Sequence, residues 1–147
     1  MRLIARAATA LRWAFVLLLL ASAIGKLLDM PGFIAVVETY RSFPQVALPV
    51  MAWAWTLTEL ALALWLAAGK APRRAASALV ALHLIYLVWL AIALGRGLAL
   101  PNCGCFGIYF ARPLTAWTLL EDGILLALAL ALWRSTQVSN ENRVPTR

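Results

Sequence analysis

Four apolar runs, each long enough to cross a lipid bilayer, constrain the fold of this chain more than any other feature. They are Leu11–Leu28, Ala47–Ala68, Ala75–Leu94 and Leu114–Trp133, with proline only near or beyond their ends. A hydrocarbon core about 30 Å thick is crossed by roughly 20 apolar residues in a helix. The pattern therefore predicts an all-α protein: a four-helix transmembrane bundle that forms one integral membrane domain over residues 1–147.

The composition supports a membrane protein over a soluble one. Hydrophobic residues make up 64% of the 147 residues and charged residues 13%, whereas soluble domains have roughly 45–50% and 25%. The net charge of +7 does not indicate a nucleic-acid-binding protein, because the basic residues separate the apolar runs instead of clustering on one polar segment. We expect the lipid bilayer as a partner and no nucleic acid.

The distribution of basic residues predicts the topology. The larger group lies before the first run, between the second and third, and after the fourth, and comprises Arg2, Arg6, Arg12, Lys70, Arg73, Arg74, Arg134, Arg143 and Arg147. The smaller group, in the other two connections, comprises Lys26, Arg41, Arg96 and Arg112. The positive-inside rule then places both termini in the cytoplasm and the other two connections outside. In a Gram-negative bacterium this is a multi-pass inner-membrane protein with those connections in the periplasm.

The first run also has features of a signal peptide, because Ala21-Ser22-Ala23 follows a basic segment and resembles a cleavage site. Apolar character continues to Leu28 and three further runs follow, so we favour an uncleaved span.

A short amphipathic helix is expected after the first run, within residues 29–44. Asp29 stands two residues before Pro31, a plausible helix start. Apolar residues then recur at helical spacing, with Glu38 and Arg41 off the stripe; the stripe is Phe33, Ile34, Val36, Val37 and Tyr40. We favour a helix on the outer membrane surface over a simple extension of the first span.

Both cysteines lie in the outer connection between the third and fourth runs, as Cys103-Gly104-Cys105. A disulfide between them would close a ring of about eleven atoms and would be strained. Strained, exposed disulfides exchange readily. Gly104 permits the unusual backbone that the ring needs, and Gly107 adds freedom beyond it. A location outside the cytoplasm is compatible with a disulfide.

Other roles for the pair are a structural disulfide, two inert thiols or a Cu(I) site. A disulfide across one residue removes almost no loop entropy from the unfolded chain. A metal site would need a third soft ligand, and the nearest soft candidates are Met30 and Met51. We therefore favour a redox-active pair in which one cysteine attacks and the other resolves the mixed disulfide.

Two ionisable residues, Glu59 and His83, lie within apolar runs. Ionisable groups inside a membrane are costly and are functional candidates by default. At 1.5 Å per residue their positions correspond to similar depths in adjacent antiparallel spans, so a hydrogen-bonded pair is geometrically available. It would act as a proton relay or quinone contact, or it would simply satisfy two polar groups between helices.

Near the outer ends of the runs, Lys26 has two candidate partners: Asp29 on the same helix and Glu121 in the fourth run. Its cation would lower the pKa of a nearby thiol if the cysteine loop folded over it. Arg96 and Arg112 are alternative activators or residues that simply extend to the membrane surface.

Several motifs together resemble one family over about residues 11–132. They are Gly25-Lys26, Phe33, Tyr40-Arg41, Pro44, Glu59, Arg96-Gly97, Cys103-Gly104-Cys105-Phe106-Gly107 and Trp117. The chain is similar to the MauE family of small membrane proteins, related to the DoxX-like redox-associated proteins. The resemblance implies a four-helix inner-membrane protein of methylamine utilisation that forms or shuttles disulfides in periplasmic clients, usually beside a thioredoxin-like partner.

The predicted function is thiol–disulfide exchange with a periplasmic thioredoxin-like protein or a disulfide-containing client such as a dehydrogenase, with a quinone as the one cofactor considered. The alternative is a non-catalytic membrane subunit or a Cu(I)-handling protein that uses the same thiolates. Cys103 and Cys105 are the candidate catalytic residues, and the supporting candidates are Gly104, Phe106, Gly107, Lys26, Glu59, His83 and Glu121.

Overall fold

The computed structural model describes residues 2–141, with side chains from Arg6 to Gln137. The described part consists of helices and loops. Its elements are α1 (Arg2–Leu27), α2 (Met30–Thr39), a 3₁₀ turn η1 (Gln45–Ala47), α3 (Leu48–Ala68), α4 (Pro72–Gly95) and α5 (Ala116–Glu141). Arg143 and Arg147, which belong to the basic set that predicted the topology, lie outside the described residues.

The predicted all-α architecture is confirmed, because α1, α3, α4 and α5 are each long and apolar enough to span a membrane. α1 begins before the predicted Leu11, and α5 continues beyond the predicted Trp133. Hydropathy alone marks only the apolar part of a helix, so it misses these more polar turns. Pro31, Pro49 and Pro72 all lie in the first turn of a helix, where a missing backbone N–H has no consequence.

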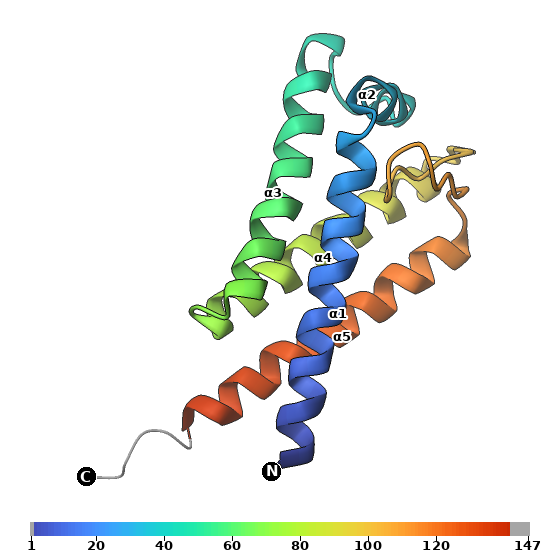
Figure 1. Cartoon of the computed structure of the whole chain (residues 1–147). Helices are drawn as coiled ribbons and strands as arrows, with labels where there is room; N and C mark the ends of the chain where they lie inside the picture. The colour runs from blue at the N-terminus through green and yellow to red at the C-terminus, as the bar shows by residue number, and fades with distance from the viewer. Residues whose placement is uncertain (1, 142–147) are drawn as a thin grey trace.

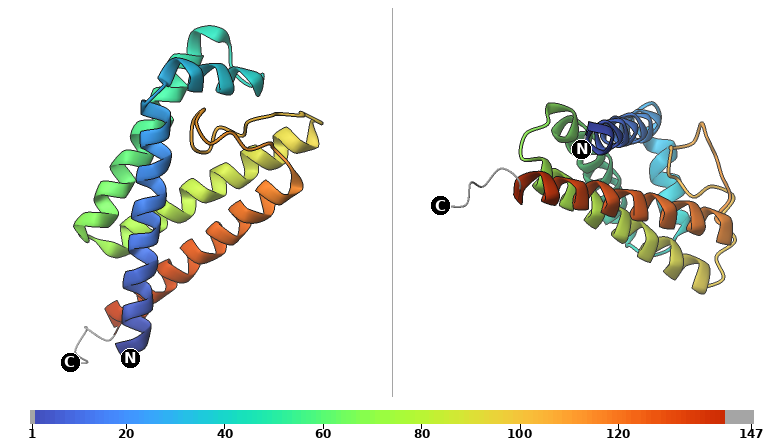
Figure 2. Two further views of the ribbon diagram at one scale, coloured as in Figure 1. Left: turned by 45° about the vertical axis from the view of Figure 1, so that its right-hand side comes forward. Right: turned by 90° about the horizontal axis from the view of Figure 1, so that it is seen from below.

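The four long helices form two pairs: α1 lies along α3, and α4 lies along α5 (Figures 1 and 2). A tight turn at residues 69–71 joins α3 to α4. In it Gly69 adopts the left-handed conformation (φ 65°) that commonly ends a helix. α3 and α4 diverge from this turn (Figure 1). The largest core cluster draws on all four long helices: Phe15, Val16, Leu19, Leu62, Ala63, Leu66, Ala75, Ala76, Leu79, Leu82, Ala129 and Leu132.

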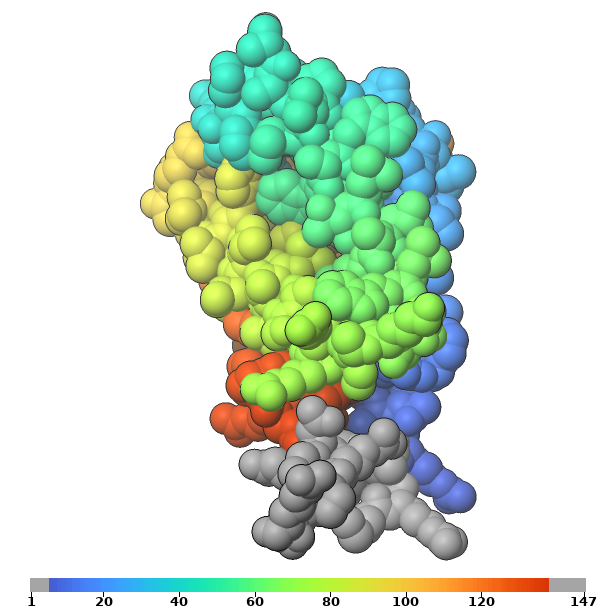
Figure 3. All heavy atoms as spheres, turned by 90° about the vertical axis from the view of Figure 1, so that its left-hand side faces the viewer, coloured from blue at the N-terminus to red at the C-terminus, as the bar shows by residue number. Residues whose placement is uncertain are grey.

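The two ends of the bundle are formed by different segments of the chain. The start of α1 and the last turns of α5 lie at one end, and α2 and the loop of residues 96–115 lie at the other, which we call the cysteine end (Figure 1). Between the ends, the face in Figure 3 is built largely from α3 and α4. These two helices carry exposed apolar side chains, including Val50, Leu57, Ile85, Val88 and Ile92. Such a surface is suited to contact with lipid.

α2 is the predicted short helix, and it runs across the direction of α1 (Figure 1). Asp29 caps its start by accepting a hydrogen bond from the Gly32 N–H at 2.8 Å. The predicted apolar stripe is directed into the protein: Phe33 and Val37 are buried, and they cluster with Ala52 of α3. The amphipathic pattern therefore reflects packing against the bundle and not only contact with a membrane surface.

A candidate thiol site at the cysteine end

The loop that contains the cysteines folds inward over the bundle. The Cys103 N–H donates to the Arg112 carbonyl at 2.7 Å, so the two arms of the loop are joined. Two side chains from other elements then hold the loop down. The Tyr40 hydroxyl donates to the Cys103 carbonyl at 2.7 Å, and the Ser22 hydroxyl donates to the Cys105 carbonyl at 2.6 Å. The cysteines are thus attached to α1 and to the end of α2.

Asn102 shapes the turn around the two cysteines. Its Oδ1 accepts a hydrogen bond from the Gly104 N–H at 2.9 Å, and its Nδ2 donates to the Gly107 carbonyl at 3.0 Å. Gly104 has a φ of 76°, in the left-handed region that favours glycine. The predicted need for glycine between the cysteines is therefore explained by the backbone itself.

A second pair of glycines lets the loop approach α1 closely. A Cβ at Gly25 would overlap the carbonyl oxygen of Phe106. A Cβ at Gly107 would overlap the Gly25 carbonyl and lie 3.0 Å from the Lys26 nitrogen. Phe106 contributes to this contact through its backbone. Gly25 and Gly107 therefore act as a backbone-to-backbone docking point for the loop.

The two thiols face each other at this point. The Cys103 and Cys105 Sγ atoms lie 2.9 Å apart, with both cysteines free. The hydrogen bond between the two thiols lowers the pKa of Cys103 to about 6, and the nearby Arg112 cation contributes to the shift. The pKa of Cys105 is raised because its proton is shared with Cys103 and because it is buried. This arrangement favours a Cys103 thiolate next to a Cys105 thiol.

A buried ion pair lies directly beneath the loop. Lys26 Nζ is 2.6 Å from both Glu59 carboxylate oxygens, and the two residues are only 2% and 1% exposed. The Ser22 hydroxyl oxygen accepts a hydrogen bond from Lys26 Nζ at 2.9 Å and lies 2.9 Å from Glu59 Oε2, and the Tyr86 hydroxyl donates to Oε1. Burying a charge is tolerated when it is paired and fully hydrogen-bonded. Because Ser22 also bonds the Cys105 carbonyl, the network connects directly to the cysteine turn.

The predicted partners of Lys26 are wrong. Asp29 caps α2, and Glu121 is 2.6 Å from Arg112 in a more exposed ion pair. Sequence spacing identified residues at similar depth but did not reveal which helix faces each of them. Glu59 on α3 faces Lys26 because α1 and α3 pack together along their length.

The suggested Glu59–His83 hydrogen bond is also not formed. His83 Nδ1 bonds the Leu79 carbonyl at 3.1 Å, and its ring packs edge-on against Phe15, with centroids 5.4 Å apart. The depths of the two residues match, but the Glu59 carboxylate contacts Lys26, Ser22 and Tyr86 instead. A role of either residue in a proton relay or a quinone contact stays a prediction.

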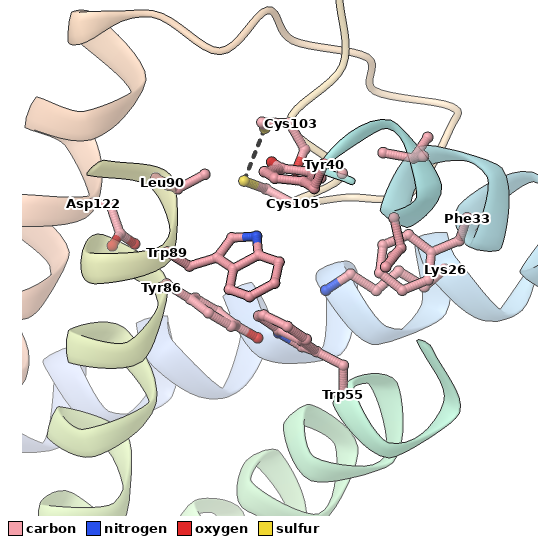
Figure 4. Close-up of a pocket in the computed structure, with 13 residues that line it drawn as sticks. Lys26, Phe33, Tyr40, Trp55, Tyr86, Trp89, Leu90, Cys103, Cys105 and Asp122 are labelled. Atoms are coloured by element: carbon pink, nitrogen blue, oxygen red, sulfur yellow. Dashed lines mark hydrogen bonds between the residues drawn. The ribbon is translucent and has the colours of Figure 1, made fainter. Parts of the chain in front are cut away.

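Two cavities adjoin the thiols. The first, of about 60 Å³, has largely aromatic walls formed by Phe33, Tyr40, Trp55, Tyr86 and Trp89 (Figure 4). These rings pack on one another: Trp55 stacks on Tyr86 at 5.4 Å and contacts Trp89 edge-on at 5.6 Å. The Lys26 ammonium lies 5.2 Å from the Phe33 ring centroid, so the cation is balanced by a ring as well as by Glu59.

The second cavity, of about 90 Å³, is more polar. Glu59 and His83 line its inner part, and the exposed Arg112–Glu121 pair also borders it. Cys103, Cys105, Tyr86, Leu90 and Asp122 border both cavities. The loop thus brings the thiols into the same space as buried residues of all four long helices.

A comparison with protein families decides the relationship of this chain. Residues 4–135 match the family described as "Methylamine utilisation protein MauE". The chain belongs to the MauE family. It is 36% identical over 123 residues to a protein of Paracoccus denitrificans named "Methylamine utilization protein MauE", and the match covers 84% of this chain and 66% of that protein. No solved structure gives a significant match.

In this MauE-family structure, several residues at the site were not singled out as site candidates from the sequence: Ser22, Tyr40, Tyr86, Asn102 and Asp122. Ser22 stands four residues before Lys26, and Tyr86 stands three after His83, so helical spacing to an ionisable residue was an available signal. Tyr40 and Asn102 act through contacts between distant segments, which spacing does not reveal. Within residues 2–141, no group of three or more His, Cys, Asp or Glu side chains is placed to hold a metal ion.

Proposed function

We propose that this MauE-family protein exchanges disulfides with a periplasmic protein through Cys103 and Cys105, as part of methylamine utilisation. The observation that carries the proposal is the pair of Sγ atoms 2.9 Å apart, with the pKa of Cys103 lowered to about 6. A thiolate is the nucleophile in disulfide exchange, and its partner thiol lies close enough to form a disulfide with little movement, since the bond length is about 2.05 Å.

The chemistry needs only the two cysteines and a partner disulfide. The Cys103 thiolate attacks one partner sulfur, a Cys103–partner S–S bond forms, and the partner's own S–S bond breaks to release a thiolate. Cys105, as a thiolate, then attacks Cys103 Sγ and displaces the second partner thiolate. Two electrons pass to the partner and the Cys103–Cys105 disulfide remains. The same steps in reverse oxidise a dithiol partner.

The proposed location is the bacterial inner membrane, with both termini in the cytoplasm and the cysteine end in the periplasm. The exposed basic residues Lys70, Arg73 and Arg74 lie in and just after the turn between α3 and α4. The cysteine loop lies at the opposite end of the bundle from the start of α1 (Figure 1). This separation supports the orientation given by the positive-inside rule.

Replacement of single cysteines tests the proposal. In cells, Cys105→Ser should trap a mixed disulfide between Cys103 and a periplasmic protein, because the resolving thiol is absent. Cys103→Ser should give no such adduct, and the variant with both cysteines replaced by serine is the negative control. Non-reducing gels detect the adduct.

Redox titration of the wild-type protein supplies a second measurement. We expect a potential within the range of exchanging pairs, roughly −120 to −270 mV. A pair that stays oxidised below about −300 mV and forms no adduct is structural, and the proposal fails.

A further inference from the structure

Asp122 on α5 is a buried carboxyl group that takes part in none of the interactions described above. It is 8% exposed, and its Oδ2 has no hydrogen-bond partner. Among the described residues, the only other buried side-chain N or O atom without a hydrogen-bond partner is Arg12 Nε, which lies near the turn between α3 and α4. Because an ionisable group within a membrane span is costly, an unpartnered carboxyl oxygen there indicates a function.

The position of Asp122 relates it to the thiols. It borders both cavities that reach Cys103 and Cys105, and Figure 4 shows it beside Tyr86 and Leu90 on the wall of the aromatic cavity. The second cavity, of about 90 Å³, has room for several water molecules, since one water needs roughly 10–15 Å³. It also borders the exposed Arg112–Glu121 pair, which gives a proton a route to the surface.

We propose that Asp122 accepts, through water in this cavity, the proton that Cys105 must lose before it can resolve the mixed disulfide. The Cys105 S–H bond breaks, its electron pair stays on sulfur, and the proton passes by way of water to the Asp122 carboxylate. In the opposite direction of exchange, Cys105 leaves Cys103 as a thiolate and takes the proton back. This role rests on the proposed function and names the acid–base group that the function requires.

The other titratable groups around Cys105 are already engaged. On α1 and α3, the Lys26 ammonium has no lone pair to accept a proton, and both Glu59 oxygens accept hydrogen bonds from Lys26. From α2, Tyr40 donates to the Cys103 carbonyl. From the loop, Arg112 is bound to Glu121.

Two groups on α4 also face the cavities. Tyr86 donates its hydroxyl hydrogen to Glu59. His83 borders only the second cavity, and its Nδ1 bonds the Leu79 carbonyl. Asp122 also acts on Cys105 electrostatically: after the larger effects of the Cys103 hydrogen bond, burial and the Cys103 charge, its carboxylate helps to raise the pKa of Cys105. Both residues line the same two cavities, so water there can connect them.

The test uses the purified, reduced, full-length protein in lipid nanodiscs, mixed rapidly with dithiodipyridine. Release of the first thiopyridone reports attack by Cys103, and release of the second reports resolution by Cys105. At neutral pH, Asp122→Asn should slow resolution about 100-fold, the scale of general acid–base catalysis, and should leave the rate of attack unchanged. The wild-type resolution rate should be nearly flat around neutral pH, whereas the variant's rate should rise about tenfold per pH unit, because its Cys105 proton must leave to bulk water.

Two further variants make the result specific. Glu38→Gln removes an exposed carboxyl on α2 and should change neither phase. Asp122→Glu keeps a carboxylate that can accept the proton, so its resolution rate should remain nearly flat with pH. If Asp122→Asn does not accumulate in cells, the Glu variant alone provides the test. A resolution rate that rises steeply with pH in Asp122→Glu contradicts the proposal. The role of Asp122 is overturned if Asp122→Asn resolves the mixed disulfide at the wild-type rate. It is also overturned if His83→Gln, and not Asp122→Asn, loses resolution. Absence of the first phase in the wild-type protein overturns the proposed function, and the role of Asp122 with it.

Discussion

Cys103 shares a hydrogen bond with the Cys105 thiol and lies near the Arg112 cation, so its pKa is lower than that of an ordinary cysteine. Cys105 keeps its proton because it shares it with Cys103 and is buried. Two residues of the same type, two positions apart, are therefore expected to have different roles in exchange: Cys103 attacks and Cys105 resolves. The sequence left this assignment open, because it depends on which charges surround each sulfur.

This difference gives a pH dependence for the reduced protein. Alkylation of Cys103 by iodoacetamide should be fast above pH about 6 and should fall below it, as the thiolate is protonated. Cys105→Ala removes the hydrogen bond and should move the midpoint up toward about 8.5, with the thiolate fraction at pH 7 about 30-fold smaller and alkylation correspondingly slower. Mass spectrometry of the alkylated peptide measures the rate. Arg112→Gln should raise the midpoint less, and an unchanged midpoint in the Ala variant would show that Cys105 does not set it.

At the scale of the elements, the most important contact is the docking of the cysteine loop on the end of α1. Gly25 and Gly107 bring the two backbones together, and hydrogen bonds from Ser22 and Tyr40 hold the same loop at Cys105 and Cys103. The apolar runs predicted the helices, since a membrane span is a local property of about 20 residues. They did not predict the docking, because it joins segments some 80 residues apart in the chain.

A matched pair of glycine variants isolates this contact. Gly107 and Gly97 have nearly the same φ, 73° and 71°, so alanine meets a similar backbone penalty of about 1–2 kcal/mol at each. A Cβ at Gly97 meets nothing within 4 Å, whereas at Gly107 it overlaps the Gly25 carbonyl. Gly107→Ala should therefore destabilise the protein by about 1–3 kcal/mol more than Gly97→Ala, measured by thermal unfolding in detergent. It should also speed alkylation of Cys105. Equal effects of the two variants would show that the loop is not held at this point.

For the whole molecule, the decisive property is that the thiols and the basic turn lie at opposite ends of the membrane-spanning bundle. α1 lies along α3 and α4 along α5, and the two pairs meet in a core that all four helices share. α3 and α4 diverge from their turn (Figure 1), and Trp55 and Trp89, which lie between them, border the cavity beneath the cysteine loop. The site is therefore open to the cysteine side and closed from the other by the core.

Labelling of intact cells tests this orientation. A membrane-impermeant maleimide added to reduced cells should label Cys103 and Cys105 from outside. In a variant without the native cysteines, Lys70→Cys should be labelled only after the inner membrane is permeabilised, because the turn between α3 and α4 is expected in the cytoplasm. Labelling in the reverse order would place the thiols in the reducing cytoplasm and would contradict the proposed exchange with a periplasmic partner.

The sequence by itself determined the class of the molecule, the approximate spans, the short helix after the first span and the cysteine pair as the place to look for chemistry. These follow from local properties: hydropathy over about 20 residues, the spacing of apolar side chains, and two thiols held one residue apart. The family resemblance, carried by short motifs, was confirmed by the match over residues 4–135.

Only the tertiary structure decided which polar groups meet. Lys26 was expected to pair with Asp29 or Glu121, and Glu59 with His83, but Lys26 pairs with Glu59 because α1 and α3 lie together with these faces turned toward each other. Asp122 gained its significance in the same way, as a carboxyl whose neighbours are engaged elsewhere. Depth in the membrane follows from counting residues along a helix, whereas the partner of a buried group depends on how each helix is rotated and which helix lies beside it.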